Sequence, residues 1–103
     1  MRVKWSPFAK QQMLQIAKYI QKEFGKKYRD NFIQKVRGSN QIIGNNPDIG
    51  KVEPLLADSP FTYHSYVLNR LNKIVYRIDN DHVEVVDFWD VRQEPNALAE
   101  RVK

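Results

Sequence analysis

The chain has 103 residues, of which 42% are hydrophobic and 12% aromatic, with a formal net charge of +5 at pH 7 and no cysteine. A chain of this length has enough residues for one hydrophobic core but not for two, which excludes a two-domain protein and predicts a single domain over residues 1–103. The lack of cysteine excludes disulfides, thiolate metal sites and cysteine nucleophiles, and it predicts a cytoplasmic protein. No apolar run is long enough for a membrane span or a secretory signal, and two histidines are too few for a histidine-only metal cage. We therefore expect no cofactor, no metal and no membrane.

The charge is distributed unevenly along the chain. Residues 1–40 contain ten Lys or Arg and two Asp or Glu, whereas residues 79–103 contain three basic and seven acidic residues. A basic surface attracts phosphate-bearing or acidic partners through Coulomb forces. Lysines on exposed helix faces also serve solubility alone, so the charge by itself identifies no partner.

The N-terminal half is predicted to form a strand and two helices. Residues 2–5 alternate between charged and bulky side chains, which is typical of a short strand. Ser6 and Pro7 form a helix start, because the Ser hydroxyl can accept an orphan amide hydrogen and Pro needs none at the first helical position. An apolar stripe at helical spacing and a terminating Gly25 follow, and a second helix is predicted over about residues 27–43. The connection between them is so short that the helices should pack as an αα-hairpin.

The C-terminal half is predicted to be mostly β-structure. Residues 45–62 contain three Pro and no sustained period, which predicts a long surface loop. Residues 63–68, 73–78 and 82–89 have period two, and the short turns between them favour antiparallel pairing. In the middle segment one face is apolar and the other partly cationic, and we expect the helices to cover the apolar face. With a short helix over residues 96–102, the sequence predicts an α+β fold: an N-terminal strand and a helical hairpin on an antiparallel sheet of three to four strands.

Four local motifs follow one another along this predicted fold. They are Trp5-Ser6-Pro7 with Ala9, Asn46-Pro47-Asp48-Ile49-Gly50, Asn72-Lys73-Ile74-Val75-Tyr76-Arg77-Ile78, and Asp90-Val91-Arg92-Gln93-Glu94-Pro95. Together with the order of the elements, they resemble the RelE/ParE family of bacterial type II toxin–antitoxin toxins over nearly the whole chain. The resemblance implies a toxin that a cognate antitoxin neutralises in a hetero-oligomer. Its target would be either the ribosome with its messenger RNA or DNA gyrase, because both activities occur on this one fold.

The resemblance also implies a set of candidate catalytic residues. In the RelE-like nucleases, basic and aromatic side chains on the open face of the sheet cleave RNA, and the matching positions here are His64, Tyr66, Lys73 and Arg92, with Arg77 expected on the same face. Attack by the RNA 2′-hydroxyl needs a base, cations around the phosphorane-like transition state, and an acid. The Lys and Arg side chains can hold a phosphate, and histidine titrates near neutrality. The set therefore suits a metal-independent messenger RNA endoribonuclease.

The sequence departs from the nuclease pattern in three places. His64 and Tyr66 stand where the ribosome-dependent nucleases have paired lysines, Leu98 lies near the position of a C-terminal tyrosine, and Asp90 stands where many relatives have histidine. A carboxylate beside the phosphate site would repel the phosphate unless it were paired. A toxin that acts by binding gyrase is therefore a second hypothesis, and a non-toxic relative that only binds its antitoxin is a third.

Each candidate also has a purely structural interpretation. The candidates on the strands suit sheet packing or exposed strand positions, and Arg92 suits an ion pair with Asp90. His82 lies at a turn, where a solvated side chain is favoured over a metal site. Phe88 and Trp89 suit base stacking, antitoxin anchoring or the core, and period two predicts that only one of them points inward.

Overall fold

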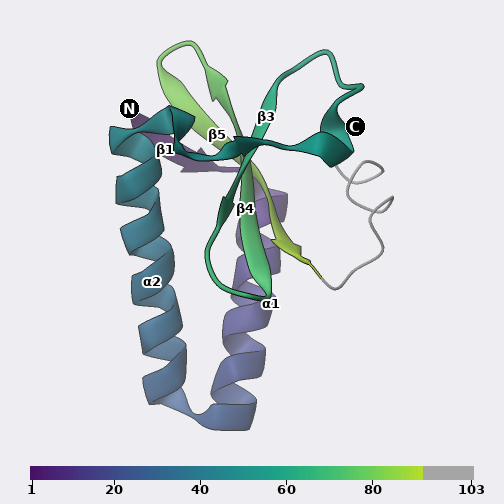
Figure 1. The fold of residues 1–103 in the computed structure, drawn as a ribbon. Coiled ribbons are helices and arrows are strands. Elements are labelled where there is room, and N and C mark those ends of the chain that lie inside the picture. Colours follow the sequence, from purple (N-terminus) through teal and green to yellow (C-terminus); the bar gives the residue numbers. More distant parts are fainter. Residues whose placement is uncertain (92–103) are drawn as a thin grey trace.

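The computed structural model describes residues 1–91, in which a helical hairpin covers one face of a five-stranded sheet (Figure 1). The strands are β1 (Arg2–Trp5), β2 (Lys51–Val52), β3 (Tyr63–Val67), β4 (Asn72–Asp79) and β5 (His82–Asp90). The α-helices are α1 (Pro7–Phe24) and α2 (Lys26–Asn45), and the 3-10 helices η1 (Pro47–Ile49) and η2 (Pro54–Leu56) flank β2. The predicted α+β class is confirmed. The helix predicted over residues 96–102 lies outside the described residues.

The strand order in the sheet is β1-β5-β4-β3-β2. β3, β4 and β5 form the predicted antiparallel meander, with Tyr66 opposite Ile74 and Ile78 opposite Val83. β1 pairs in parallel with β5, so that Val3 lies opposite Val83. β2 is the strand that the sequence did not predict, because its two residues lie inside a Pro-rich segment and are too few to show an alternation.

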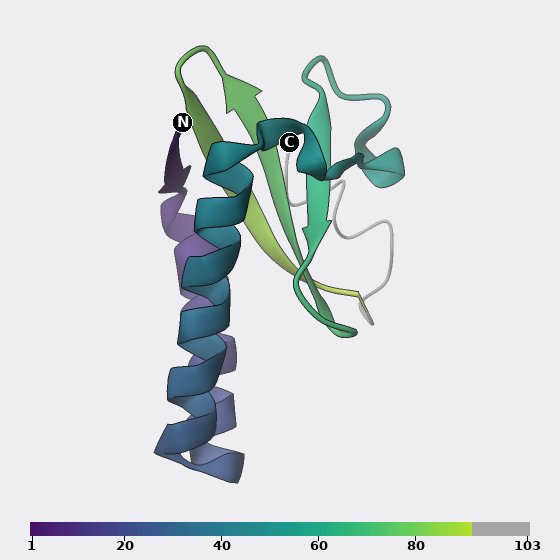
Figure 2. The same ribbon diagram turned by 60° about the vertical axis from the view of Figure 1, so that its left-hand side comes forward.

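The helical hairpin forms as its sequence predicts. The Ser6 hydroxyl accepts a hydrogen bond from the Ala9 amide at 3.1 Å, and Pro7 is the first helical residue. Gly25 alone joins the helices, with a φ of 100° in the region that favours glycine. The two helices consequently run back along each other and project well beyond the sheet (Figure 2). Neither of these two helices has the length and apolarity to cross a membrane.

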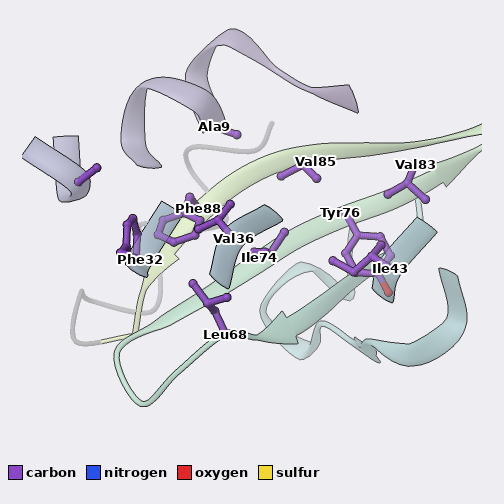
Figure 3. Close-up of a cluster of buried hydrophobic side chains, with 11 residues drawn as sticks. Ala9, Phe32, Val36, Ile43, Leu68, Ile74, Tyr76, Val83, Val85 and Phe88 are labelled. Atoms are coloured by element: carbon purple, nitrogen blue, oxygen red, sulfur yellow. The ribbon is translucent and has the colours of Figure 1, made fainter. Parts of the chain in front are cut away.

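The main hydrophobic core lies between the hairpin and the sheet (Figure 3). The Phe88 ring lies 5.9 Å from the Trp5 ring and 5.9 Å from the Phe32 ring, measured between centroids. Trp5 also donates its indole N–H to Asn40 Oδ1 at 2.9 Å, which joins β1 to α2. A register shift between β4 and β5 allows both Val85 and Phe88 to face the helices. The other buried members are Ala9, Ala17, Val36, Ile43, Leu68, Ile74, Tyr76 and Val83.

The opposite face of the sheet carries a second, smaller core. Val75 and Trp89 are buried there together with Leu56 of η2 and Tyr63 of β3. The prediction that only one of Phe88 and Trp89 points inward is therefore wrong. The two side chains do point to opposite faces, but both faces of the sheet are covered at this position.

Gly50 lies in direct contact with the sheet. Its amide donates to the Tyr76 hydroxyl at 3.0 Å, and a Cβ atom at this position would lie 2.7 Å from that hydroxyl and 2.8 Å from the Ser65 carbonyl oxygen. We expect Gly50→Ala to lower the free energy of unfolding by about 1–3 kcal/mol, the usual cost of overpacking. Urea denaturation measures the change. The control is Gly38→Ala in α2, where an added Cβ meets nothing within 4 Å and a gain of about 0.5–1 kcal/mol is expected. Equal effects at the two glycines would contradict the contact argument.

Candidate functional site

The nominated catalytic residues do not lie together. Lys73 and Arg77 of β4 are on the sheet face opposite the helices, with the second core. His64 and Tyr66 of β3 lie opposite β4 residues of the main core, on the helix-facing side. Arg92 lies outside the described residues. Of the four candidates that the structure describes, two therefore lie on each face of the sheet.

The expectation that the nominated strand residues share one open face is wrong. Residues directly opposite each other in a sheet share a face, and even-numbered residues of β3 pair with even-numbered residues of β4. This parity puts His64 beside Tyr76 instead of beside Lys73. Adding or removing one residue in the β3–β4 connection would move His64 to the same face as Lys73. The face on which His64 lies is therefore set by the turn and not by the strand sequences.

Lys73 is held by a buried carboxylate. Its Nζ forms a salt bridge with Oε1 of Glu53, whose side chain is 1% exposed, while the Lys73 side chain is 15% exposed. The other oxygen of Glu53 accepts the Leu55 amide at 3.4 Å, and the Glu53 amide donates to the Tyr63 carbonyl at 2.8 Å. Lys73 therefore fastens the segment around η2 to the sheet. Its charge is compensated within the protein, which reduces its attraction for a phosphate.

Arg77 is also engaged within the protein. Its guanidinium carbon lies 4.6 Å from the centroid of the Phe61 ring, and its Nη2 lies 3.4 Å from Oδ2 of Asp79. The Phe61 ring in turn meets the edge of Tyr63, with 6.4 Å between centroids. The cation–π contact and the ion pair orient Arg77 along the sheet surface as a packing residue.

Tyr76 and His64 hold the loop that follows α2. The Tyr76 hydroxyl donates to the Pro47 carbonyl at 2.6 Å and accepts from the Gly50 amide at 3.0 Å. The His64 ring stacks on Tyr76 at 5.4 Å, and its Nδ1 lies 3.0 Å from the Gly50 carbonyl oxygen. Burial raises the pKa of the Tyr76 hydroxyl, and the Asp48 carboxylate acts in the same direction. The stacked pair is a structural clamp on the helix-facing side.

The raised pKa of Tyr76 gives the clamp a pH signature. An unfolded tyrosine loses its proton at about pH 10, where the folded hydroxyl still keeps it. The contribution of the Tyr76 hydroxyl to the free energy of unfolding is therefore complete below about pH 10. It is lost as the pH rises through the higher pKa that the hydroxyl has in the folded protein. We expect wild type to exceed Tyr76→Phe by about 1–3 kcal/mol in unfolding free energy near pH 8, and by less at about pH 10.5. Guanidinium titrations at both pH values measure the difference, and an unchanged difference would contradict the account.

His82 lies at the start of β5, next to the β4–β5 turn. Its ring nitrogens lie 3.4 Å from Asp81 Oδ1 and 3.3 Å from Glu84 Oε2. The hydrogen bond with His82 holds the pKa of Asp81 below its ordinary value. Within residues 1–91, no group of three or more His, Asp or Glu side chains is arranged to hold a metal ion.

An apolar groove lies between the outer half of α1 and the β3–β4 turn, with a volume of about 640 Å³. Ile16, Ile20 and Phe32 line it. Tyr19 and Leu71 also line it and are 60% and 43% exposed. Exposed apolar side chains gathered around a groove are typical of a protein-binding surface. The sequence showed the apolar stripe of α1, but the groove depends on the turn that approaches it from the sheet.

Comparison with known protein families and solved structures found a matching family and similar folds. Residues 3–95 match the family model described as ParE toxin of the type II toxin–antitoxin system parDE. The chain belongs to the ParE toxin family. A chain of the chromosomal ParDE toxin–antitoxin system from P. aeruginosa matches with a TM-score of 0.71 and 14% identity, over 87% of this chain and 95% of that chain. The YoeB dimer from Staphylococcus aureus matches with a TM-score of 0.54 and 24% identity, over 85% and 93%.

At these identities the two structures show a shared fold and no more. The comparison with curated proteins gave no match. Family membership confirms the expected resemblance and identifies a toxin of a type II toxin–antitoxin system.

Proposed function

We propose that this ParE family toxin arrests growth by binding DNA gyrase, without cleaving messenger RNA. The observation that carries the proposal is the placement of the nominated nuclease residues. Lys73 and Arg77 are bound within the protein, to Glu53 and Asp79 respectively. His64 lies on the other side of the sheet.

RNA cleavage needs its base and its cations around one phosphate. A β-sheet with side chains on both faces separates His64 from Lys73 by the thickness of the sheet, so one phosphate cannot contact both. Binding a protein target makes no such demand, since it needs only a complementary surface. The described part of the chain therefore supports a toxin that acts by docking in the cytoplasm.

A cognate antitoxin is proposed to occupy the apolar groove through an acidic, amphipathic segment. The exposed Tyr19 and Leu71 side chains would be covered by the apolar face of such a segment. Arg70 and Asp90 line the groove with opposite charges, but the neighbouring hairpin is basic, so acidic residues on the segment would be complementary in charge to the hairpin. The resulting complex is a hetero-oligomer of toxin and antitoxin.

Two assays on the purified protein test the proposed target. One follows supercoiling of relaxed plasmid by gyrase, and the other follows reconstituted translation with primer extension on the messenger. We expect inhibited supercoiling and an uncut messenger. Codon-phased cuts that disappear in Arg92→Ala would instead establish a ribosome-dependent messenger RNA endonuclease. Normal supercoiling and translation, with normal growth on expression without antitoxin, would indicate a non-toxic relative that only binds its antitoxin.

A further inference from the structure

The helical hairpin carries a large unbalanced positive charge. α1 and α2 together contain eight Lys or Arg and two acidic residues. Among the residues that the structure describes, Arg29 is the only one of these eight cations in an ion pair, with Asp30 at 2.8 Å. The other seven cations have no neutralising partner in that part of the chain, and such a field attracts polyanions.

A second groove, which we call the hairpin groove, lies between α1 and α2 and has a volume of about 500 Å³. Lys18 of α1 and Arg37 of α2 are among its lining residues. Arg29 spans it, donating to Gln21 Oε1 at 2.7 Å while it pairs with Asp30. The hairpin groove shares no lining residue with the apolar groove, so the two surfaces are separate.

The lining of the hairpin groove combines charged, amide and apolar side chains. Gln21 and Gln34 accompany the cations, and both are exposed. The exposed Leu14, together with Ala17 and Ile33, adds apolar surface to the same lining. Phosphate contacts need no apolar centre, because cations and amide groups supply them. The eight cations of the hairpin against its two acidic residues favour a ligand with dense, regular negative charge, which a phosphate backbone supplies at about one charge per 1.7 Å of duplex axis.

We propose that this cationic hairpin surface binds the phosphate backbone of duplex nucleic acid. Two of the cations on each helix form a row along a surface groove, Lys10 with Lys18 on α1 and Arg29 with Arg37 on α2, and packed helix axes lie about 8–10 Å apart. Within each row, Lys10 and Lys18, or Arg29 and Arg37, are eight residues apart, which is roughly 12 Å along a helix. Two rows can reach both strands beside a groove about 6–12 Å wide, whereas a single strand offers one row of phosphates. The hairpin projects beyond the sheet, which leaves room for a long rigid ligand (Figures 1 and 2).

Fluorescence anisotropy with a labelled DNA duplex of about 20 base pairs tests the proposal, measured at several salt concentrations with the full chain. We expect the affinity to fall steeply with salt, because bound phosphates release counterions. The double variant Lys18→Ala/Arg37→Ala should weaken binding by on the order of tenfold and reduce the slope of log affinity against log salt by about two. Asp30→Asn should act in the opposite direction and strengthen binding, since it removes a carboxylate from the groove and frees Arg29.

The matched control is Lys4→Ala/Lys51→Ala, which removes two exposed cations from β1 and β2 and leaves the hairpin intact. It should keep the wild-type salt slope. Equal losses in the two double variants would overturn the proposal, because net charge alone would then explain binding. Equal affinity for single-stranded RNA of the same length, or tighter binding of a polyglutamate peptide, would overturn it as well. The assay contains neither gyrase nor ribosomes, so its outcome is independent of the proposed function.

Discussion

Lys73→Met is expected to lower the free energy of unfolding by about 3–5 kcal/mol, because it leaves the buried Glu53 carboxylate without its counter-charge. The Glu53 side chain is only 1% exposed, so water cannot replace the lost ammonium group. The segment around η2 would lose its attachment to β4, and the second core beside it would loosen. Chemical denaturation of the purified variant measures the change.

Two further variants identify the cause of this loss. Glu53→Met/Lys73→Met replaces both charges with apolar groups of similar size and should recover most of the stability. Arg77→Met on the same strand breaks a more exposed pair, with side chains 24% and 37% exposed, and should cost less than about 1 kcal/mol. If Lys73→Met cost no more than Arg77→Met, the buried pair would not have the structural role assigned to it.

Phe88→Ala is expected to lower the free energy of unfolding by about 3–5 kcal/mol, through lost burial and the cavity that remains. The Phe88 side chain is 1% exposed and lies between the rings of Trp5 and Phe32. Its loss removes the point at which β1, β5 and α2 meet. The environment of Trp5 should change as well, which tryptophan fluorescence of the folded variant reports.

Phe24→Ala is the matched control for the core substitution. Phe24 is 62% exposed at the end of α1, where its ring meets Tyr28 at 6.1 Å. We expect this substitution to change the unfolding free energy by only about 0.5 kcal/mol, because little apolar surface is buried at the site. A similar loss at the two phenylalanines would show that Phe88 does not organise the core.

The parts of the fold that the sequence predicted correctly are those specified by short-range signals. Ser6 and Pro7 begin α1, Gly25 ends it, and alternating side chains mark the three strands of the meander. β2 and the parallel pairing of β1 arise from contacts between distant segments. Neither a strand of two residues nor the choice of a neighbour in the sheet has a local pattern.

The candidate site was predicted less well than the fold. The face of each residue on β4 followed from period two, but the face of His64 and Tyr66 depends on how the β3–β4 turn sets the register. The partner of Lys73 was missed because Glu53 lies in a Pro-rich segment, 20 residues away in the chain. A buried carboxylate next to Pro54 has no sequence signature that separates it from an exposed loop residue.

The most direct test of the central claim is growth arrest by Glu53→Met/Lys73→Met, expressed without antitoxin and verified as folded by circular dichroism. The claim is that Lys73 supports the structure and performs no chemistry. We therefore predict arrest as strong as that caused by the wild-type chain at equal expression. Normal growth with the folded double variant would contradict the claim and would make Lys73 a functional residue of the toxin.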